Sequence, residues 1–375
     1  MREFQNADLI RLLANDEVSV RTLALNFLSE GYAQEPAVLT SVFAGWDRWG
    51  VEVAFPEFPI LSHVPIPAAV VLECCQRSAA IVPNRKVTDR QTRCAGKLME
   101  QVVRLPAADL QPHQARIAET VGLSKIFFRI DLTDLENRLA MLELTSDQLA
   151  ERLDSAIATL AEQPDSGTAY HQALAALESL RFEHPAYIDM AAAIVRTPPD
   201  SGVQATSFRV SLQSLIQFPQ AGAEEALAKQ LVDTREAVHC NAVEALVRIG
   251  SPLAAAHLVA KFDQADAGAQ RWIARGLQRV RADGLAAELA RLRTASQNPA
   301  LWGMLLVAEV RQFDLTSLEL IAAELERVHG FSGALIDALN VYVRVYETAP
   351  GARLIQQAFM SYVKRVSDEI ASINA

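Results

Sequence analysis

Residues 238–250, VHCNAVEALVRIG, and residues 269–281, AQRWIARGLQRVR, carry apolar residues at the same spacing. When the two stretches are aligned, Leu246 falls on Leu277. The shift that takes Leu246 to Leu277 takes Leu277 forward to Ala308 in ALWGMLLVAEVRQ. Applied backward, it takes Leu246 to Leu215 in SFRVSLQSLIQFP. Consecutive segments that share one period indicate an internal repeat, which takes precedence over the assignment of single helices.

Each repeat has a second apolar segment after the first. These segments are residues 253–259, 285–292 and 315–325, and a last pair at 335–346 and 353–366 ends the array. Two short helices cannot bury their apolar faces alone, whereas stacked neighbours can. We therefore predict an all-α protein, an α-solenoid of antiparallel helix pairs. A generic helical bundle with helices of similar length is the alternative.

The stretch DEVSVRTLALNFLSEG at residues 16–31 resembles the HEAT-like (HEAT/PBS-lyase-type) repeat family. Its matching positions are Asp16, Val20, Arg21, Ala24, Leu28 and Gly31. The unit at 238–250 keeps Val238, Ala242, Leu246 and Gly250, but has His239 where the family usually has Arg. The resemblance covers residues 6–31 and about 203–346. It implies HEAT-like antiparallel helix pairs and a protein partner bound along a concave face.

Prolines interrupt the helical pattern at positions 56, 59, 65 and 67, within the apolar segment AFPEFPILSHVPIP (54–67). Proline lacks a backbone donor and restricts the residue before it, so this segment is expected to be extended. It is either a buried connector between repeats or a lid for a partner. We expect N-terminal HEAT-like helices at 1–53, this connector at 54–67, a helical middle region at 68–200 and a C-terminal repeat array at 201–375.

The middle region is predicted from its caps and loops. A charged turn at 84–92 precedes helices at about 109–122, 134–142 and 145–162, and Thr145 or Ser146 is the N-cap of the last one. Loops rich in Pro, Asp, Ser and Gly follow at 162–168 and 196–204.

Composition restricts the class of protein. Of 375 residues, 50% are hydrophobic and 21% are charged, and the net charge is −10. This balance disfavours disorder and a role that depends on neutralising many phosphates. The N-terminal residues do not read as a secretory signal, and no apolar stretch reaches the roughly 18 residues of a membrane span. With Cys74, Cys75, Cys94 and Cys240 expected as reduced thiols, we predict a cytoplasmic protein with no membrane partner.

Motifs for catalysis and cofactor binding do not occur in the sequence. None of the seven histidines belongs to an HExxH pair or precedes Glu, as the ligands of some HEAT-like iron hydroxylases do. His239 and Cys240 are adjacent, and would point about 100° apart on a helix. No pattern for a phycobilin-lyase chromophore site or a serine nucleophile is present. We expect no catalytic residue, no metal and no cofactor; enzymatic activity stays open, with a non-enzyme favoured.

Three arginines follow one another at every fourth position in 269–281. On a helical wheel Arg275 and Arg279 lie about 40° and 80° from Arg271, beside the apolar face, with Trp272 at its edge. One repeat earlier the equivalent residues are Cys240, Glu244 and Arg248, and one repeat later they are Trp302, Leu306 and Val310. The basic residues do not continue from repeat to repeat, which disfavours an extended phosphate track.

Two interpretations of these arginines remain. They form a local patch for an acidic peptide, a carboxylate or a single phosphate, or they are structural, either paired with Glu244 or solvated. The candidate partner-binding residues are Arg271, Arg275, Arg279, Arg248, Glu244, Trp302 and Leu306. The expected function is a non-catalytic scaffold or adaptor that binds a protein with an acidic segment. The alternative is a nucleic-acid or phosphate binder, similar to HEAT-like DNA glycosylases, that uses the Arg271, Arg275 and Arg279 face. The oligomeric state stays open.

Overall fold

The computed structural model describes residues 6–33, 35–55, 68–81, 107–128, 141–163 and 223–373, and scattered positions within 94–105 and 166–176. Every regular element among these residues is helical, which confirms the all-α prediction. Leu215, most of the 54–67 connector, the 84–92 turn, residues 134–140 of the predicted helix at 134–142 and the 196–204 loop lie outside the described residues.

The N-terminal half contributes helices of 4 to 17 residues. They are α1 (Ala7–Leu12), α2 (Val18–Glu30), α3 (Pro36–Trp49), α4 (Val51–Ala54), α5 (Val71–Ile81), α7 (Ala107–Leu110), α8 (Gln114–Phe128) and α10 (Ser146–Glu162), with 3-10 turns η2 (Ala68–Val70), η3 (Gln111–His113) and η4 (Met141–Glu143). The single helix expected at 109–122 is wrong in detail. Since Pro112 has no backbone N–H, η3 separates α7 from α8 there.

The C-terminal half is continuous from residue 223 to residue 373. Its helices are α14 (Ala223–Ala228), α15 (Glu236–Ile249), α16 (Pro252–Phe262), α17 (Ala267–Leu277), α18 (Leu285–Ala295), α19 (Pro299–Val310), α20 (Leu318–Leu325), α21 (Gly333–Val345) and α22 (Ala352–Ile373), with 3-10 turns η5 (Lys229–Val232) and η6 (Leu315–Ser317). The predicted second segments of the repeats correspond to α16, α18 and η6 with α20.

Capping residues set several of these helix boundaries. Asp266 accepts from the Ala269 backbone N–H at 2.8 Å and starts α17. Gly250, with a left-handed φ of 57°, ends α15. Thr145 and Gln148 form a capping box at the start of α10. The prediction of a helix from Thr145 or Ser146 to the residues before Pro164 is therefore confirmed.

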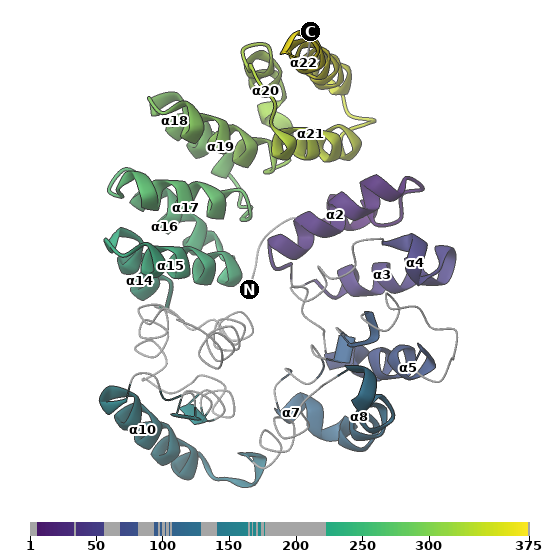
Figure 1. The fold of residues 1–375 in the computed structure, drawn as a ribbon, viewed down its shortest axis with the longest axis vertical. Coiled ribbons are helices and arrows are strands. Elements are labelled where there is room, and N and C mark those ends of the chain that lie inside the picture. The colour runs from purple at the N-terminus through teal and green to yellow at the C-terminus, as the bar shows by residue number, and fades with distance from the viewer. Residues whose placement is uncertain are drawn as a thin grey trace.

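Helices α15, α17, α19 and α21 pack in succession as one layer, and α14, α16 and α18 pack behind them as a second (Figure 1). The repeat positions Leu246, Leu277 and Ala308 are all fully buried. At Gly276 a Cβ would lie 2.6 Å from Cγ1 of Val243, so the close packing of α17 on α15 depends on glycine. The repeat period found in the sequence therefore corresponds to equivalent core positions on successive helices.

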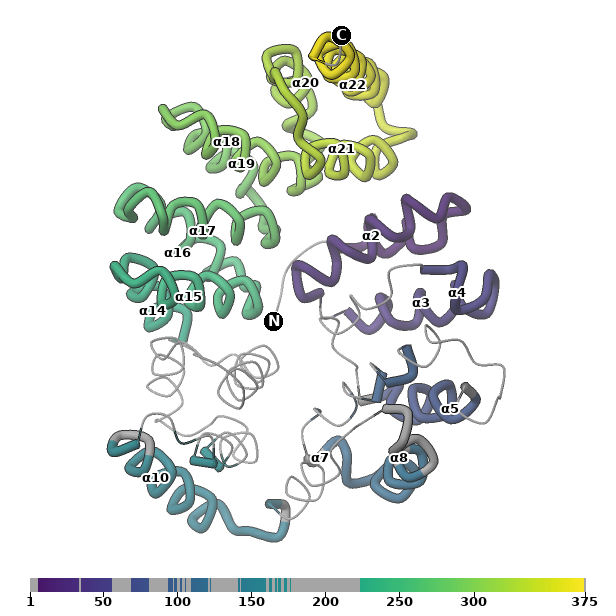
Figure 2. The backbone as a smooth tube through the Cα atoms, viewed as in Figure 1, coloured from purple at the N-terminus to yellow at the C-terminus, as the bar shows by residue number. Residues whose placement is uncertain are grey.

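The N-terminal helices return to the C-terminal layer. In Figures 1 and 2, α2 lies beside α21, and both α1 and α2 pack against α21. One hydrophobic core includes residues of α1–α5 together with residues of α19–α22. Arg11 donates to the Val345 carbonyl at 3.2 Å, and Arg344 pairs with Glu17. The described helices thus follow a closed path in which segments near the two ends of the sequence are neighbours.

Single residues bear on several other expectations. Phe55, the last described residue of the connector, is fully buried beside Gly45. The four cysteines form no disulfide with one another, and Cys240 alone among them is half-exposed. Among the described helices, none is both long and apolar enough to cross a membrane.

Candidate functional site

The three arginines of 269–281 have different environments in the structure. Arg271 and Arg275 lie on α17 with exposed side chains. Arg279 lies just beyond the end of α17 at Leu277, and its side chain is only 23% exposed. The helical wheel placed the three together because it extended the helix too far. Arg279, the last arginine of the three, belongs to a turn, and its side chain does not share the direction of Arg271 and Arg275.

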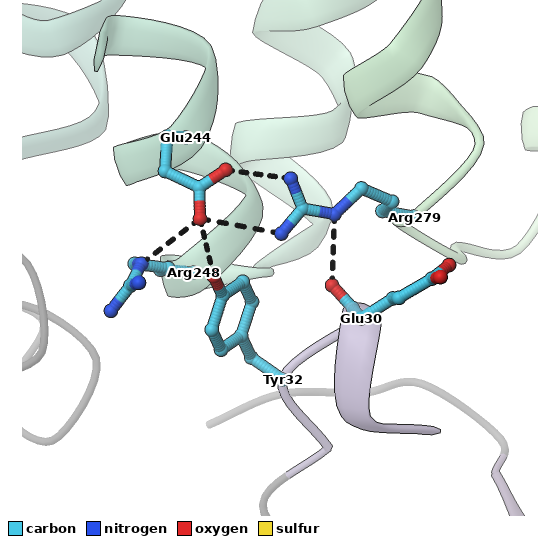
Figure 3. Close-up of polar contacts among 5 residues, drawn as sticks. All are labelled: Glu30, Tyr32, Glu244, Arg248 and Arg279. Carbon is cyan, nitrogen blue, oxygen red and sulfur yellow. Dashed lines mark hydrogen bonds and ion pairs between the residues drawn. The ribbon is translucent and has the colours of Figure 1, made fainter. Parts of the chain in front are cut away.

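Arg279 is bound by the neighbouring helix. Its Nη1 lies 2.6 Å from Oε2 of Glu244 on α15, and its Nη2 donates to Oε1 of the same carboxylate at 3.3 Å. Figure 3 shows this two-point contact. The structure therefore supports the pairing interpretation for Arg279, with the partner that the repeat register suggested. It does not support pairing of Arg275 with Glu244, although the two residues occupy equivalent positions in the aligned segments.

Two further groups bind the Glu244 carboxylate. Arg248, one turn further along α15, places Nε 3.1 Å from Oε1 of Glu244 and is itself buried. The Tyr32 hydroxyl donates to the same oxygen. The Tyr32 ring lies beneath both guanidinium groups, with ring centroid distances of 4.5 Å to Arg248 and 5.3 Å to Arg279.

The remaining contact comes from the C-terminal end of α2. Arg279 Nε donates to the Glu30 carbonyl at 3.0 Å. The last carbonyls of a helix carry partial negative charge, so a guanidinium is favourable there. Glu30, Tyr32, Glu244, Arg248 and Arg279 are named here the closure cluster, because they join the N-terminal turn to the C-terminal layer (Figure 3).

The turn that ends α2 is shaped for this contact. A Cβ at Gly31 would lie 2.8 Å from the Arg279 carbonyl oxygen, so only glycine allows the two backbones to approach. Tyr32 follows with a left-handed φ of 51°, which directs its ring back toward α15. Gly31, one of the positions that carry the resemblance to HEAT-like repeats, therefore has a physical role at this contact.

A third arginine reaches the same turn. Arg311, directly after α19, places Nη2 2.6 Å from Oε2 of Glu30, and its guanidinium carbon lies 4.0 Å from the Phe27 ring centroid. Arg248, Arg279 and Arg311 therefore lie at the ends of three successive helices of one layer and converge on the end of α2. The sequence register missed Arg311, since the repeat period places its neighbour Val310 at the position of Arg279.

Charge coupling perturbs the ionisation of the closure cluster. Burial would raise the pKa of Glu244, but Arg279 and Arg248, with hydrogen bonds from Arg279 and Tyr32, lower it to about 2. Burial, together with the Glu244 carboxylate, raises the pKa of Tyr32 to about 12, against the opposing effect of the two arginines. At neutral pH the cluster is therefore a carboxylate held between two guanidinium groups and a neutral phenol. It carries no free nucleophile or base.

Leu306 was expected on the partner-binding surface, and its placement there is wrong. Leu306 and Val310 are fully buried in the core shared by the two halves. Helix α19 contacts α17, α18 and α21, so nearly all of its sides are covered. The helical wheel drawn for α17, which has one exposed side, therefore does not describe α19. Trp302 is half-exposed and lies 5.4 Å from the guanidinium of the buried Arg293.

A smaller surface remains on α15 and α17 outside the closure cluster. The Arg275 guanidinium carbon lies 4.7 Å from the Trp272 ring centroid, and Trp272 Nε1 donates to Glu236 at 3.1 Å. Burial, with smaller contributions from Glu244 and Glu236, raises the pKa of the nearby Cys240 to about 11, against the opposing effect of Arg275. Arg271, Trp272 and Arg275 are named here the α17 surface.

The His239–Cys240 pair has no common face. His239 is buried with Nδ1 3.0 Å from the Asp233 carbonyl oxygen, whereas Cys240 is half-exposed. Within the described residues, no three His, Cys, Asp or Glu side chains gather as a metal site would require.

Comparisons with known proteins assign the chain to no family. No protein-family model matches it, and no curated protein does. A crystal structure of an engineered protein, a structural-genomics target, aligns over 97% of this chain and 99% of its own length at 15% identity. Its TM-score is 0.24, a value at which the alignment carries no argument about fold or function.

Proposed function

We propose that the protein is a non-catalytic scaffold, built as an α-solenoid of HEAT-like antiparallel helix pairs, that binds another protein through the α17 surface. The register of the buried positions Leu246, Leu277 and Ala308 and the two packed layers support the repeat architecture. The arrangement of α15, α17, α19 and α21 presents adjacent helices of one layer, as extended partner-binding arrays do.

One observation carries the functional proposal. Arg279 and Arg248 are taken up by the closure cluster, while Arg271 and Arg275 stay exposed beside a half-exposed Trp272. Arginine and tryptophan are enriched where proteins bind one another, and guanidinium groups bind carboxylates by charge-assisted hydrogen bonds. An acidic segment of a partner protein fits this surface.

Nucleic acid fits less well. A backbone track needs cationic donors on several successive helices. Arg279 and Arg248 direct theirs to Glu244, and Arg311 directs its own to Glu30. Two exposed arginines on one helix, in a chain of net charge −10, leave too few contacts for a duplex.

The test compares the wild-type protein with an Arg271→Glu/Arg275→Glu double variant. A labelled deca-glutamate peptide and a labelled DNA duplex serve as probes in fluorescence anisotropy, and affinity capture reports cellular partners. The double variant should bind the peptide at least about tenfold more weakly, corresponding to about 1.4 kcal/mol, and should lose the captured partners.

Arg327→Glu is the matched control, since Arg327 is well exposed and lies just after the end of α20, away from the α17 surface. The melting temperature of each variant should stay near that of the wild type, because these side chains are exposed. Equal recovery of partners by the double variant and the wild type would refute the proposal. Binding of the duplex in preference to the peptide would favour the nucleic-acid alternative.

A further inference from the structure

A cleft lies where the N-terminal helix α1 meets the C-terminal layer. Its volume is about 440 Å³, within the range of roughly 300–1,000 Å³ typical of small-molecule sites. The walls come from α1, the turn between α17 and α18, the turn between α19 and η6, and the end of α21. The cleft is separate from the closure cluster and from the α17 surface.

Arg281 supplies the cationic side chain of the cleft wall. Among the described residues its guanidinium takes part in none of the hydrogen bonds or ion pairs, and its nearest aromatic contact is the Phe313 ring at 5.5 Å. Burial and, to a lesser extent, Arg311 together lower the pKa of Arg281 to about 9, against the opposing effect of Glu35. A partly desolvated cation without a hydrogen-bonded counterion attracts an anionic group.

Most other polar side chains of the wall are already occupied within the protein. Gln312 donates to the Val280 and Ala308 carbonyls at 2.9 and 3.2 Å. The Tyr346 hydroxyl donates to the Phe313 carbonyl, and Asp314 accepts from the Thr316 backbone at 2.9 Å. These bonds hold the wall in place and leave little capacity for a ligand.

Asp283 is a negatively charged exception to this pattern of occupied polar side chains. It lies on the same turn as Arg281, is exposed and lines the cleft, yet the two side chains form no ion pair with one another within the described residues. Asp8, which also lines the cleft, pairs with Arg11 at 3.5 Å and is 59% exposed. An available cation and an available anion therefore face the same space.

Apolar side chains also line the cleft. Leu315 is exposed and Phe313 is half-exposed, whereas Leu9 and Val345 are buried. Because acidic residues outnumber arginine on the described wall, a simple anion such as inorganic phosphate would meet net repulsion. A small ligand that carries both charges and an apolar group satisfies all three parts of the wall.

We propose that this cleft binds a free α-amino acid with a large apolar side chain, its carboxylate on Arg281, its ammonium group on Asp283 and its side chain against the apolar wall. Arginine suits the carboxylate because its planar fork can donate two parallel hydrogen bonds. The ligand would touch both the N-terminal and the C-terminal helices, and its binding would stabilise their contact.

The test uses L-phenylalanine as the probe in isothermal titration calorimetry and thermal denaturation of the full chain. N-acetyl-L-phenylalanine lacks the ammonium group and L-phenylalanine amide lacks the carboxylate, so each removes one of the two proposed contacts. L-phenylalanine should bind and raise the melting temperature, and each derivative should bind at least about tenfold more weakly, as the loss of one charged hydrogen-bonded contact predicts. Inorganic phosphate should not bind.

Substitutions distinguish a ligand-binding role of Arg281 and Asp283 from a purely structural role. Arg281→Gln and Asp283→Asn should each weaken L-phenylalanine binding at least about tenfold, and the exposed control Arg327→Gln should not. Without ligand, Arg281→Gln should keep or raise the melting temperature, because it removes an unpaired, partly buried charge. Glu35→Gln tests the competing assignment, in which Glu35 is the counterion of Arg281.

Three results would overturn the proposal. One is the absence of L-phenylalanine binding at about 10 mM, and another is equal binding of L-phenylalanine and both derivatives. The third is a melting temperature lowered to the same extent by Arg281→Gln and Glu35→Gln, which would show that the two residues form a structural pair. None of these results bears on the α17 surface, so the scaffold proposal is tested separately.

Discussion

Replacement of Glu244 by Gln tests the electrostatic account of the closure cluster. The substitution keeps the shape of the side chain and removes the charge that holds Arg248, Arg279 and the Tyr32 hydroxyl. The pKa of Glu244 falls from its ordinary value of 4.5 to about 2, and each pKa unit corresponds to about 1.4 kcal/mol. The ionised carboxylate therefore contributes about 3 kcal/mol at neutral pH, and Glu244→Gln should lower the free energy of unfolding by that order.

The pH dependence gives the sharper test. Because the folded-state pKa lies below the unfolded one, the stabilisation is complete above about pH 4.5 and is lost as the pH falls toward 2. The difference between wild type and Glu244→Gln should shrink from about 3 kcal/mol at neutral pH to about 1 kcal/mol near pH 3. Urea unfolding monitored by circular dichroism at both pH values measures it.

Glu236→Gln is the matched control. Glu236 lies on the same helix, is exposed and accepts one hydrogen bond from Trp272 at 3.1 Å, so its loss should cost less than about 1 kcal/mol at either pH. A Glu244→Gln effect that is the same at both pH values would refute the reasoning, since it would then arise from packing and not from charge.

Three further outcomes follow from the structure. Tyr32→Phe removes one hydrogen bond but keeps the ring under the guanidinium groups, so urea unfolding should report a loss of about 1 kcal/mol. Gly276→Ala forces a Cβ to 2.6 Å from a side chain of α15 and should lower the free energy of unfolding by about 1–3 kcal/mol. Gly303→Ala, with open space around its Cβ, should instead raise the free energy of unfolding by up to about 1 kcal/mol. Iodoacetamide labelling followed by mass spectrometry should modify Cys240 before Cys74, because burial raises the thiol pKa of both but Cys240 is half-exposed; labelling of Cys74 first would contradict this order.

The sequence carried enough information for the local structure of this chain. The alignment of Leu246 with Leu277 and Ala308 identified equivalent core positions, and Thr145 and Pro164 bounded α10, because apolar spacing and capping are local properties. The register even identified Glu244 as a neighbour of the arginine run, without indicating which arginine it binds.

What the sequence could not provide was the return of α2 to the C-terminal layer. Tyr32 and Glu30 lie far along the chain from Glu244 and Arg279, and no periodicity relates them. Leu306 was misplaced for the same reason, since the burial of α19 depends on the helices that cover it. The signals that were available are Gly31, which has no need to be glycine in a free turn, and the recurrence of arginine at Arg248, Arg279 and Arg311.

The convergence of three arginines on one turn limits how the length of this protein can change. An open stack of helices can gain or lose a unit at its end with little effect on the rest. Here Arg248, Arg279 and Arg311 all meet the same few residues at the end of α2. Duplication or deletion of a unit between them would displace at least one arginine by the spacing of neighbouring helices, about 8–10 Å. A change in the number of helices in this segment would therefore break part of this contact.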